Sequence, residues 1–78
     1  MNLKFKIIEK KPKTNVYLII NTSGCELGTV CFYSPWRRYV SIMFEDIVVD
    51  SSCHKEISNF LDKLMEERKN EMEKDKIN

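Results

Sequence analysis

In the first half of the chain, apolar and polar positions follow the two-residue period of β-strands. Residues 3–8 alternate apolar side chains with lysine, and residues 16–20 form a run of β-branched and aromatic side chains. Two further strands are expected at residues 26–33 and 38–44, and a short fifth strand at residues 47–49. In the first strand, the positions expected to face inward are Leu3, Phe5 and Ile7.

Turn-forming residues separate these strands. Pro12 interrupts the polar segment 10–15, which predicts a loop there. The segment 21–24, with sequence Asn-Thr-Ser-Gly, has the residue types of a hairpin turn. Gly28 lies inside the third strand, where a glycine indicates either a bulge or a close approach of two backbones.

The second half of the chain changes to the period of a helix. Asp50, Ser51 and Ser52 are all good N-cap residues, so a helix is expected to begin among them. One apolar stripe at helical spacing follows, made up of Cys53, Ile57, Phe60, Leu61, Leu64 and Met65. Beyond Arg68 the stripe thins, so residues 70–78 are expected to fray.

Together these elements predict an α+β fold, an antiparallel sheet of four to five strands with one C-terminal helix packed on one face. A chain of 78 residues has room for a single domain, here residues 1–78 with a core at about 3–68. With 42% hydrophobic and 32% charged residues, the chain is too apolar for a disordered protein and too charged for a membrane protein. The N-terminus lacks the apolar core of a signal peptide, so a cytoplasmic location is expected.

Charge is distributed unevenly along the chain. Residues 1–40 carry seven Lys and Arg against two Glu, whereas residues 41–78 carry six Lys and Arg against ten Asp and Glu. The strand half therefore has a net charge of +5 and the helix half −4. A basic half can attract phosphate or an acidic protein surface, and two oppositely charged solvated faces are the simpler explanation.

The sequence gives little support for a metal site or a catalytic site. Cys25, Cys31, Cys53 and His54 are the potential zinc ligands, but their spacing matches no zinc knuckle, and reduced thiols are expected. Cys53 and the only histidine are adjacent, which on a helix points their side chains about 100° apart and suits a catalytic pair poorly. No glycine-rich phosphate loop is present. We therefore expect a non-enzymatic protein without a metal or cofactor.

The strongest candidate for binding is the segment 33–39, which contains the only tryptophan and the only Arg-Arg pair. Trp, Tyr and Arg are enriched at binding hot spots, and they also stack on bases and pair with phosphates. The alternative is that Trp36 fills the core while the arginines pair with helix carboxylates such as Asp62 or Glu66. The candidate binding residues are Tyr33, Trp36, Arg37, Arg38 and Tyr39.

Several segments resemble a family of small uncharacterised proteins of bacteriophages and prophages, especially those of AT-rich Gram-positive bacteria. The resemblance covers about residues 12–68, and its most specific part is Pro35-Trp36-Arg37-x-Tyr39. Arg38 stands where the family has a polar residue such as Gln, and segment 40–45 departs from its more aromatic, proline-rich run. The other matching segments are Thr14-Asn15-Val16-Tyr17, Leu27-Gly28-Thr29-Val30, Cys53 and Ile57-x-x-Phe60-Leu61-x-x-Leu64.

This resemblance implies an accessory phage protein acting in the host cytoplasm, since such proteins often bind host machinery, defence systems included. The first hypothesis is a protein that binds and inhibits a host protein through segment 33–39. The second is a nucleotide or nucleic-acid binder that uses the same residues. The third is a small subunit of an assembly, including a homo-oligomer formed through a sheet edge or the end of the helix.

Overall fold

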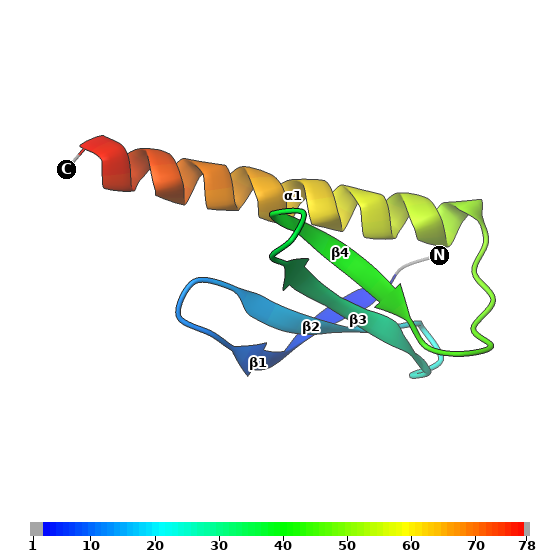
Figure 1. Ribbon diagram of the computed structural model, residues 1–78. Helices are drawn as coiled ribbons and strands as arrows, with labels where there is room; N and C mark the ends of the chain where they lie inside the picture. The colour runs from blue at the N-terminus through cyan, green and yellow to red at the C-terminus, as the bar shows by residue number, and fades with distance from the viewer. Residues whose placement is uncertain (1–2, 78) are drawn as a thin grey trace.

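The computed structural model describes the backbone of residues 3–77 and the side chains of residues 3–70. Its four strands form one antiparallel sheet in the order β1-β2-β3-β4, and a single helix follows, as Figure 1 shows. The predicted α+β architecture is confirmed. The elements are β1 (Lys4–Lys10), β2 (Asn15–Ile20), β3 (Glu26–Tyr33), β4 (Arg38–Met43) and α1 (Ser51–Ile77).

The connection from β4 to α1 does not contain the predicted fifth strand at residues 47–49. After β4 the chain turns at Asp46, whose φ of 64° lies in the left-handed region, and the Ile47 N–H donates to the Phe44 carbonyl at 3.4 Å. Val48 is 94% exposed in the connection that follows. The turn carries the chain away from the sheet toward the start of α1, so this apolar segment does not pair.

The β2–β3 hairpin turns where the sequence predicts. The Asn21 side-chain oxygen accepts hydrogen bonds from the backbone N–H groups of Ser23 (3.0 Å) and Cys25 (2.9 Å). Gly24 has a φ of 87°, which a residue without Cβ adopts freely. The local contacts of the asparagine therefore fix the reversal of the chain.

Gly28 marks a close approach of two backbones. A Cβ at this position would lie 2.8 Å from Met43 Cα on the neighbouring strand β4, and closer still to the carbonyl oxygen of Ile42. The glycine therefore lets β3 pair tightly with the edge strand β4 where β4 ends at Met43, as one of its two interpretations predicts.

One face of the sheet packs against α1 and forms the core. Of the inward positions predicted on β1, Leu3 and Phe5 pack against this core, but Ile7 is 42% exposed. Ile7 pairs with Tyr17 as Phe5 pairs with Ile19, so it lies on the inward face as predicted, and the register shift follows it, between Ile7 and Glu9. The buried cluster consists of Ile19, Leu27, Val30, Tyr39, Ile57 and Leu64.

Helix α1 begins at the predicted cap. The Cys53 N–H donates to the Asp50 carboxylate at 2.9 Å, and the His54 N–H donates to the Asp50 carbonyl at 3.0 Å. Every residue of the predicted apolar stripe is buried or half-buried. Phe60 stacks on Phe5 with ring centroids 3.9 Å apart, which ties the helix to β1. The predicted fraying of residues 70–78 concerns side chains that lie almost entirely outside the described residues, and it stays a prediction.

Candidate functional site

The β3–β4 hairpin carries the predicted binding segment at its tip. Tyr33 pairs with Arg38, which leaves residues 34–37 as the loop. The Trp36 N–H donates to the Tyr33 carbonyl at 3.2 Å, and the Arg37 N–H donates to the Ser34 carbonyl at 3.1 Å. Arg37 completes the reversal with a φ of 53°. These turns give the tip a defined shape.

Two aromatic rings are exposed at this tip. Trp36 is 68% exposed and Tyr33 is 42% exposed. Their rings meet edge to face, with centroids 5.1 Å apart and an interplanar angle of 85°. The alternative in which Trp36 fills the core is therefore wrong. The edge-to-face contact holds the indole against the end of the sheet while most of its surface stays open to solvent.

The two arginines of the tip are also exposed. Within residues 3–70, no ion pair links the guanidinium group of Arg37 or Arg38 to a carboxylate, so the suggested pairing with Asp62 or Glu66 is not observed there. Both positive charges therefore belong to the same hairpin end as Trp36 and have no described counter-ion. We name the four residues Tyr33, Trp36, Arg37 and Arg38 the hairpin tip.

Tyr39 does not belong to this exposed group. It is only 8% exposed, and its ring meets the Phe32 ring edge to face at 5.5 Å inside the core. Side chains alternate between the two faces of a strand, so Arg38 points outward and Tyr39 points toward α1. The Tyr39 N–H donates to Met65 Sδ at 3.3 Å, which joins the edge strand β4 to the helix. Strand alternation therefore separates Tyr39 from the exposed tip, and Tyr39 instead helps to line a groove between the β1–β2 loop and α1.

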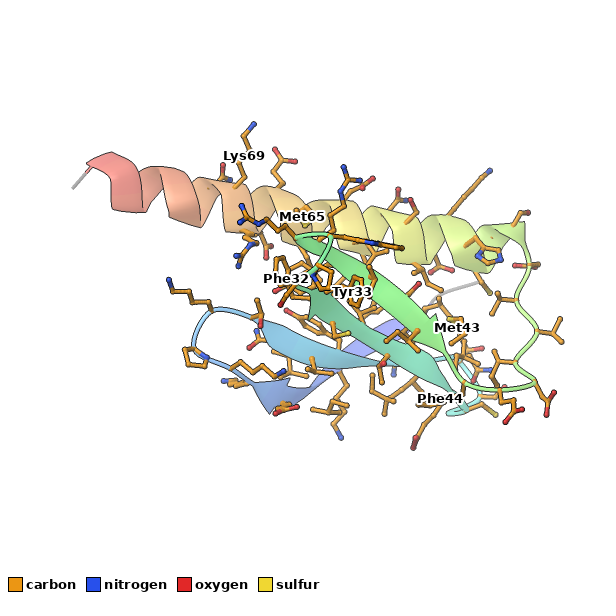
Figure 2. All side chains as sticks on the ribbon, viewed as in Figure 1. Phe32, Tyr33, Met43, Phe44, Met65 and Lys69 are labelled. Atoms are coloured by element: carbon orange, nitrogen blue, oxygen red, sulfur yellow. The ribbon has the colours of Figure 1, made fainter. Side chains whose placement is uncertain are left out.

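The sheet face opposite α1 continues from the hairpin tip. Its paired positions on β3 and β4 are Tyr33 with Arg38, Cys31 with Val40, and Thr29 with Ile42. Ile42 is 53% exposed, and the described part of the chain has no second helix or sheet to cover this face. Figure 2 shows Tyr33 at the hairpin end of the sheet and Phe44 at the opposite end. A partly apolar surface therefore extends away from the tip.

Sequence reasoning missed a second feature at the same end of the molecule. Arg68 on α1 places its guanidinium carbon 4.2 Å from the centroid of the Phe32 ring. Beside it lies a groove of about 190 Å³ between the helix and the β1–β2 loop. The basic Lys11-Pro12-Lys13 segment could have indicated one side of this groove from the sequence. The other side, on α1, could not be assigned to it, because Arg68 lies more than 50 residues away in the chain.

Among the described residues, no three or more His, Cys, Asp or Glu side chains cluster in a way that could hold a metal ion. Cys25 is exposed, Cys31 half-buried and Cys53 buried in the core, so the three cysteines lie in different environments. His54 is exposed in the first turn of α1. The Cys53 N–H, which donates to Asp50, lowers the pKa of that carboxyl below its ordinary value of 3.8. Of these side chains, Asp50 caps the start of α1 and Cys53 packs in the core.

Comparison with known proteins places the chain among phage proteins. It is 34% identical over 58 residues to a protein of Acholeplasma phage L2 described as "Uncharacterized 9.3 kDa protein", and the match covers 73% of this chain and 74% of that protein. The chain belongs to the family of this phage protein. No family model and no solved structure matches it. Within its described residues, this phage-family protein has no helix long and apolar enough to cross a membrane.

Proposed function

We propose that this phage-family protein is a non-enzymatic accessory protein that binds and inhibits a host protein, and that the hairpin tip is its contact surface. The observation that carries the proposal is the exposure of Trp36, at 68%, on a hairpin whose turns are fixed by hydrogen bonds. A small domain that leaves its only tryptophan in solvent gives up a large contribution to its own core. Binding a partner is the function that uses such a ring.

The backbone of Arg37 supports the same surface. A non-glycine residue in the left-handed region costs about 1–2 kcal/mol, and Asn or Gly would adopt this conformation more easily. Strained positions of this kind cluster where function needs them. Arg37 therefore fits a residue that is kept for its guanidinium group, not for the turn.

The neighbouring open face favours a protein over a nucleic acid as partner. Val40 and Ile42 extend the surface away from the hairpin tip, and an apolar surface beside aromatic and arginine anchors is typical of protein interfaces. The phage context favours a component of a host defence system as the class of target, acting in the host cytoplasm.

The test starts with a tagged chain used to capture its partner from host lysate, followed by purification of that partner and measurement of both affinity and inhibition. The test variant is Trp36→Ala with Arg37→Asn, because asparagine keeps the left-handed turn accessible. We expect Kd to rise at least about 30-fold, the effect of losing about 2 kcal/mol at a hot spot. Inhibition should weaken in parallel.

The matched control is Val48→Ala with Lys55→Ala, which also removes one exposed apolar side chain and one positive charge. It lies in the β4–α1 connection and on α1, away from the tip. Equal affinity of the two double variants for the partner, with both folded by circular dichroism, contradicts the proposal.

A second function, binding of a nucleotide or nucleic acid, is favoured by one observation: the hairpin that exposes the Trp36 indole also carries two exposed arginines without described counter-ions. Base stacking contributes about 1–3 kcal/mol per base, and phosphate contacts make affinity fall steeply with salt. A gel-shift and calorimetric titration with short single-stranded oligonucleotides and with nucleotides tests it. Salt-insensitive or absent binding eliminates this function and leaves the protein partner.

A further inference from the structure

The groove beside Arg68 lies between the β1–β2 loop and α1, and residues of both elements line it. The loop is held closed by a hydrogen bond from the Lys11 N–H to the Thr14 carbonyl at 2.8 Å. Pro12, at the centre of the loop, fixes its own φ and reduces the freedom of the segment. The groove is therefore formed by a tied loop on one side and a helix on the other.

Positive charge dominates the lining of this groove. The charged residues of the lining are Lys11, Lys13, Arg68 and Glu67, which gives a net charge of +2. The lysines come from the basic strand half of the chain and Arg68 from the acidic helix half, so the fold brings together charges that the sequence keeps apart. Concentrated positive charge in a concave site attracts anions more strongly than the same charges on an open surface.

Arg68 is held in position by an aromatic ring. Its guanidinium carbon lies 4.2 Å from the Phe32 ring centroid, and the residue is half-buried. A guanidinium group stacked on a ring keeps its N–H donors at its edge, in the fork that matches two phosphate oxygens. The stacking reduces the conformational freedom that binding would otherwise have to remove.

The groove also contains uncharged hydrogen-bond donors. Thr14, Asn15 and Tyr17 also line the groove. The Asn15 side-chain amide donates to the Tyr17 hydroxyl oxygen at 3.4 Å, so the Tyr17 hydroxyl hydrogen remains available to donate to a ligand. Charged and neutral donors converging on one concave site are the arrangement that proteins use to bind phosphate.

We propose that this groove binds the phosphate group or diphosphate of a small ligand, at a site distinct from the hairpin tip. A volume of about 190 Å³ is below the range of about 300–1,000 Å³ for pockets that enclose a whole drug-sized molecule. The groove therefore holds the phosphate end, and any remaining part of the ligand extends into solvent. The chemistry recognised is a phosphate or diphosphate, whether free or at the end of a nucleotide.

The experiment titrates the full chain separately with sodium pyrophosphate and with ADP, following backbone amide resonances by NMR. We expect the amides of Lys11, Lys13 and Thr14 to shift in a saturable way. Equal affinity for the two probes supports recognition of phosphate alone, and tighter binding of ADP supports a nucleotide as the source. No shift of these amides by either probe up to about 10 mM overturns the proposal.

A double variant, Lys11→Gln with Lys13→Gln, is expected to raise Kd for pyrophosphate at least about tenfold. The matched control is Lys4→Gln with Lys6→Gln, which removes the same charge from exposed positions on β1 outside the groove. Equal weakening by the two double variants means non-specific attraction and overturns the proposal. Trp36→Ala should leave pyrophosphate binding unchanged, so failure at the groove and failure at the hairpin tip can be distinguished.

Discussion

Arg37 combines a strained backbone with a solvent-exposed side chain, and this combination is the clearest functional signal at the scale of a single residue. Its φ of 53° would suit glycine or asparagine better, and no described ion pair stabilises the side chain. The hydrogen bonds of the loop hold the residue in place. The local structure thus bears a cost at the position where the guanidinium group is presented.

Replacing Arg37 with asparagine should affect stability and binding in opposite directions. The free energy of unfolding is expected to rise by about 0.5–1 kcal/mol, because asparagine tolerates the left-handed region. Affinity for the captured host partner should fall. Urea denaturation and a binding titration on the same sample measure both, and a loss of stability together with unchanged affinity would mean that Arg37 serves only the turn.

The chain's own pattern predicted where the hairpin tip lies, but not which side chains it exposes. The alternation of side chains along β4 could be predicted from the sequence. Which of the two alternating sets faces the core could not, because that depends on the side of the sheet on which the helix packs. Tyr39 was therefore counted with the binding residues although it packs on Phe32. The exposure of Trp36 was likewise undecided, because an indole at a tip can turn inward or outward with the same local sequence.

At the scale of elements, α1 is joined to the sheet by aromatic contacts. Phe60 stacks on Phe5 and meets Tyr17 edge to face at 5.0 Å, while Met65 reaches the edge of β4. These contacts lie one to two helical turns apart, so the helix is fixed at more than one point along the sheet. The apolar stripe was predictable from spacing, whereas the ring partners were not, because they lie on strands distant in sequence.

Phe60→Ala should therefore weaken the fold noticeably. Burial of this ring is partial, so the expected loss in the free energy of unfolding is about 2 kcal/mol, below the 3–5 kcal/mol typical of fully buried phenylalanine. Asn59→Ala, at the exposed neighbouring position, should change stability by less than about 0.5 kcal/mol. Similar denaturation midpoints for the two variants would argue against the stacked arrangement.

Asp50 gives the start of α1 a pH dependence of known sign. Because the folded state lowers its pKa below 3.8, the carboxylate stabilises the fold fully at pH values above 3.8. This contribution is lost as the pH falls through the lowered pKa. Asp50→Ser retains a capping oxygen but does not titrate, so its melting temperature should fall less than that of the wild type on acidification. If the melting temperatures of the two proteins fell in parallel on acidification, the Asp50 cap would be excluded as the source of the pH dependence.

At the scale of the whole molecule, the principal extents are 44 × 22 × 22 Å, because a 27-residue helix is longer than the strands beside it. Figure 1 shows the β1–β2 and β3–β4 loops at the end of the sheet over which α1 continues. The hairpin tip and the groove proposed to bind phosphate thus share one end of the molecule. The strands, their hairpins and the helix were predictable from the sequence pattern. The convergence of positive charges from distant parts of the chain was not predictable, because it depends on the tertiary structure.

The suggestion of a homo-oligomer also belongs to this scale and stays a prediction. The contact predicted for a second copy is a sheet edge or the end of the helix. Light scattering distinguishes a particle of 9.3 kDa from one of twice that mass.

The central claim is that recognition takes place at the Trp36 indole, and fluorine NMR of a fluorotryptophan-labelled chain tests it most directly. Trp36 is the only tryptophan, so the labelled protein gives one resonance. In the free protein this resonance should show the solvent isotope shift of an exposed ring, as 68% exposure requires. Saturation with the purified host partner should shift the resonance and reduce its isotope shift. A resonance that keeps its position and isotope shift in the complex would contradict the account.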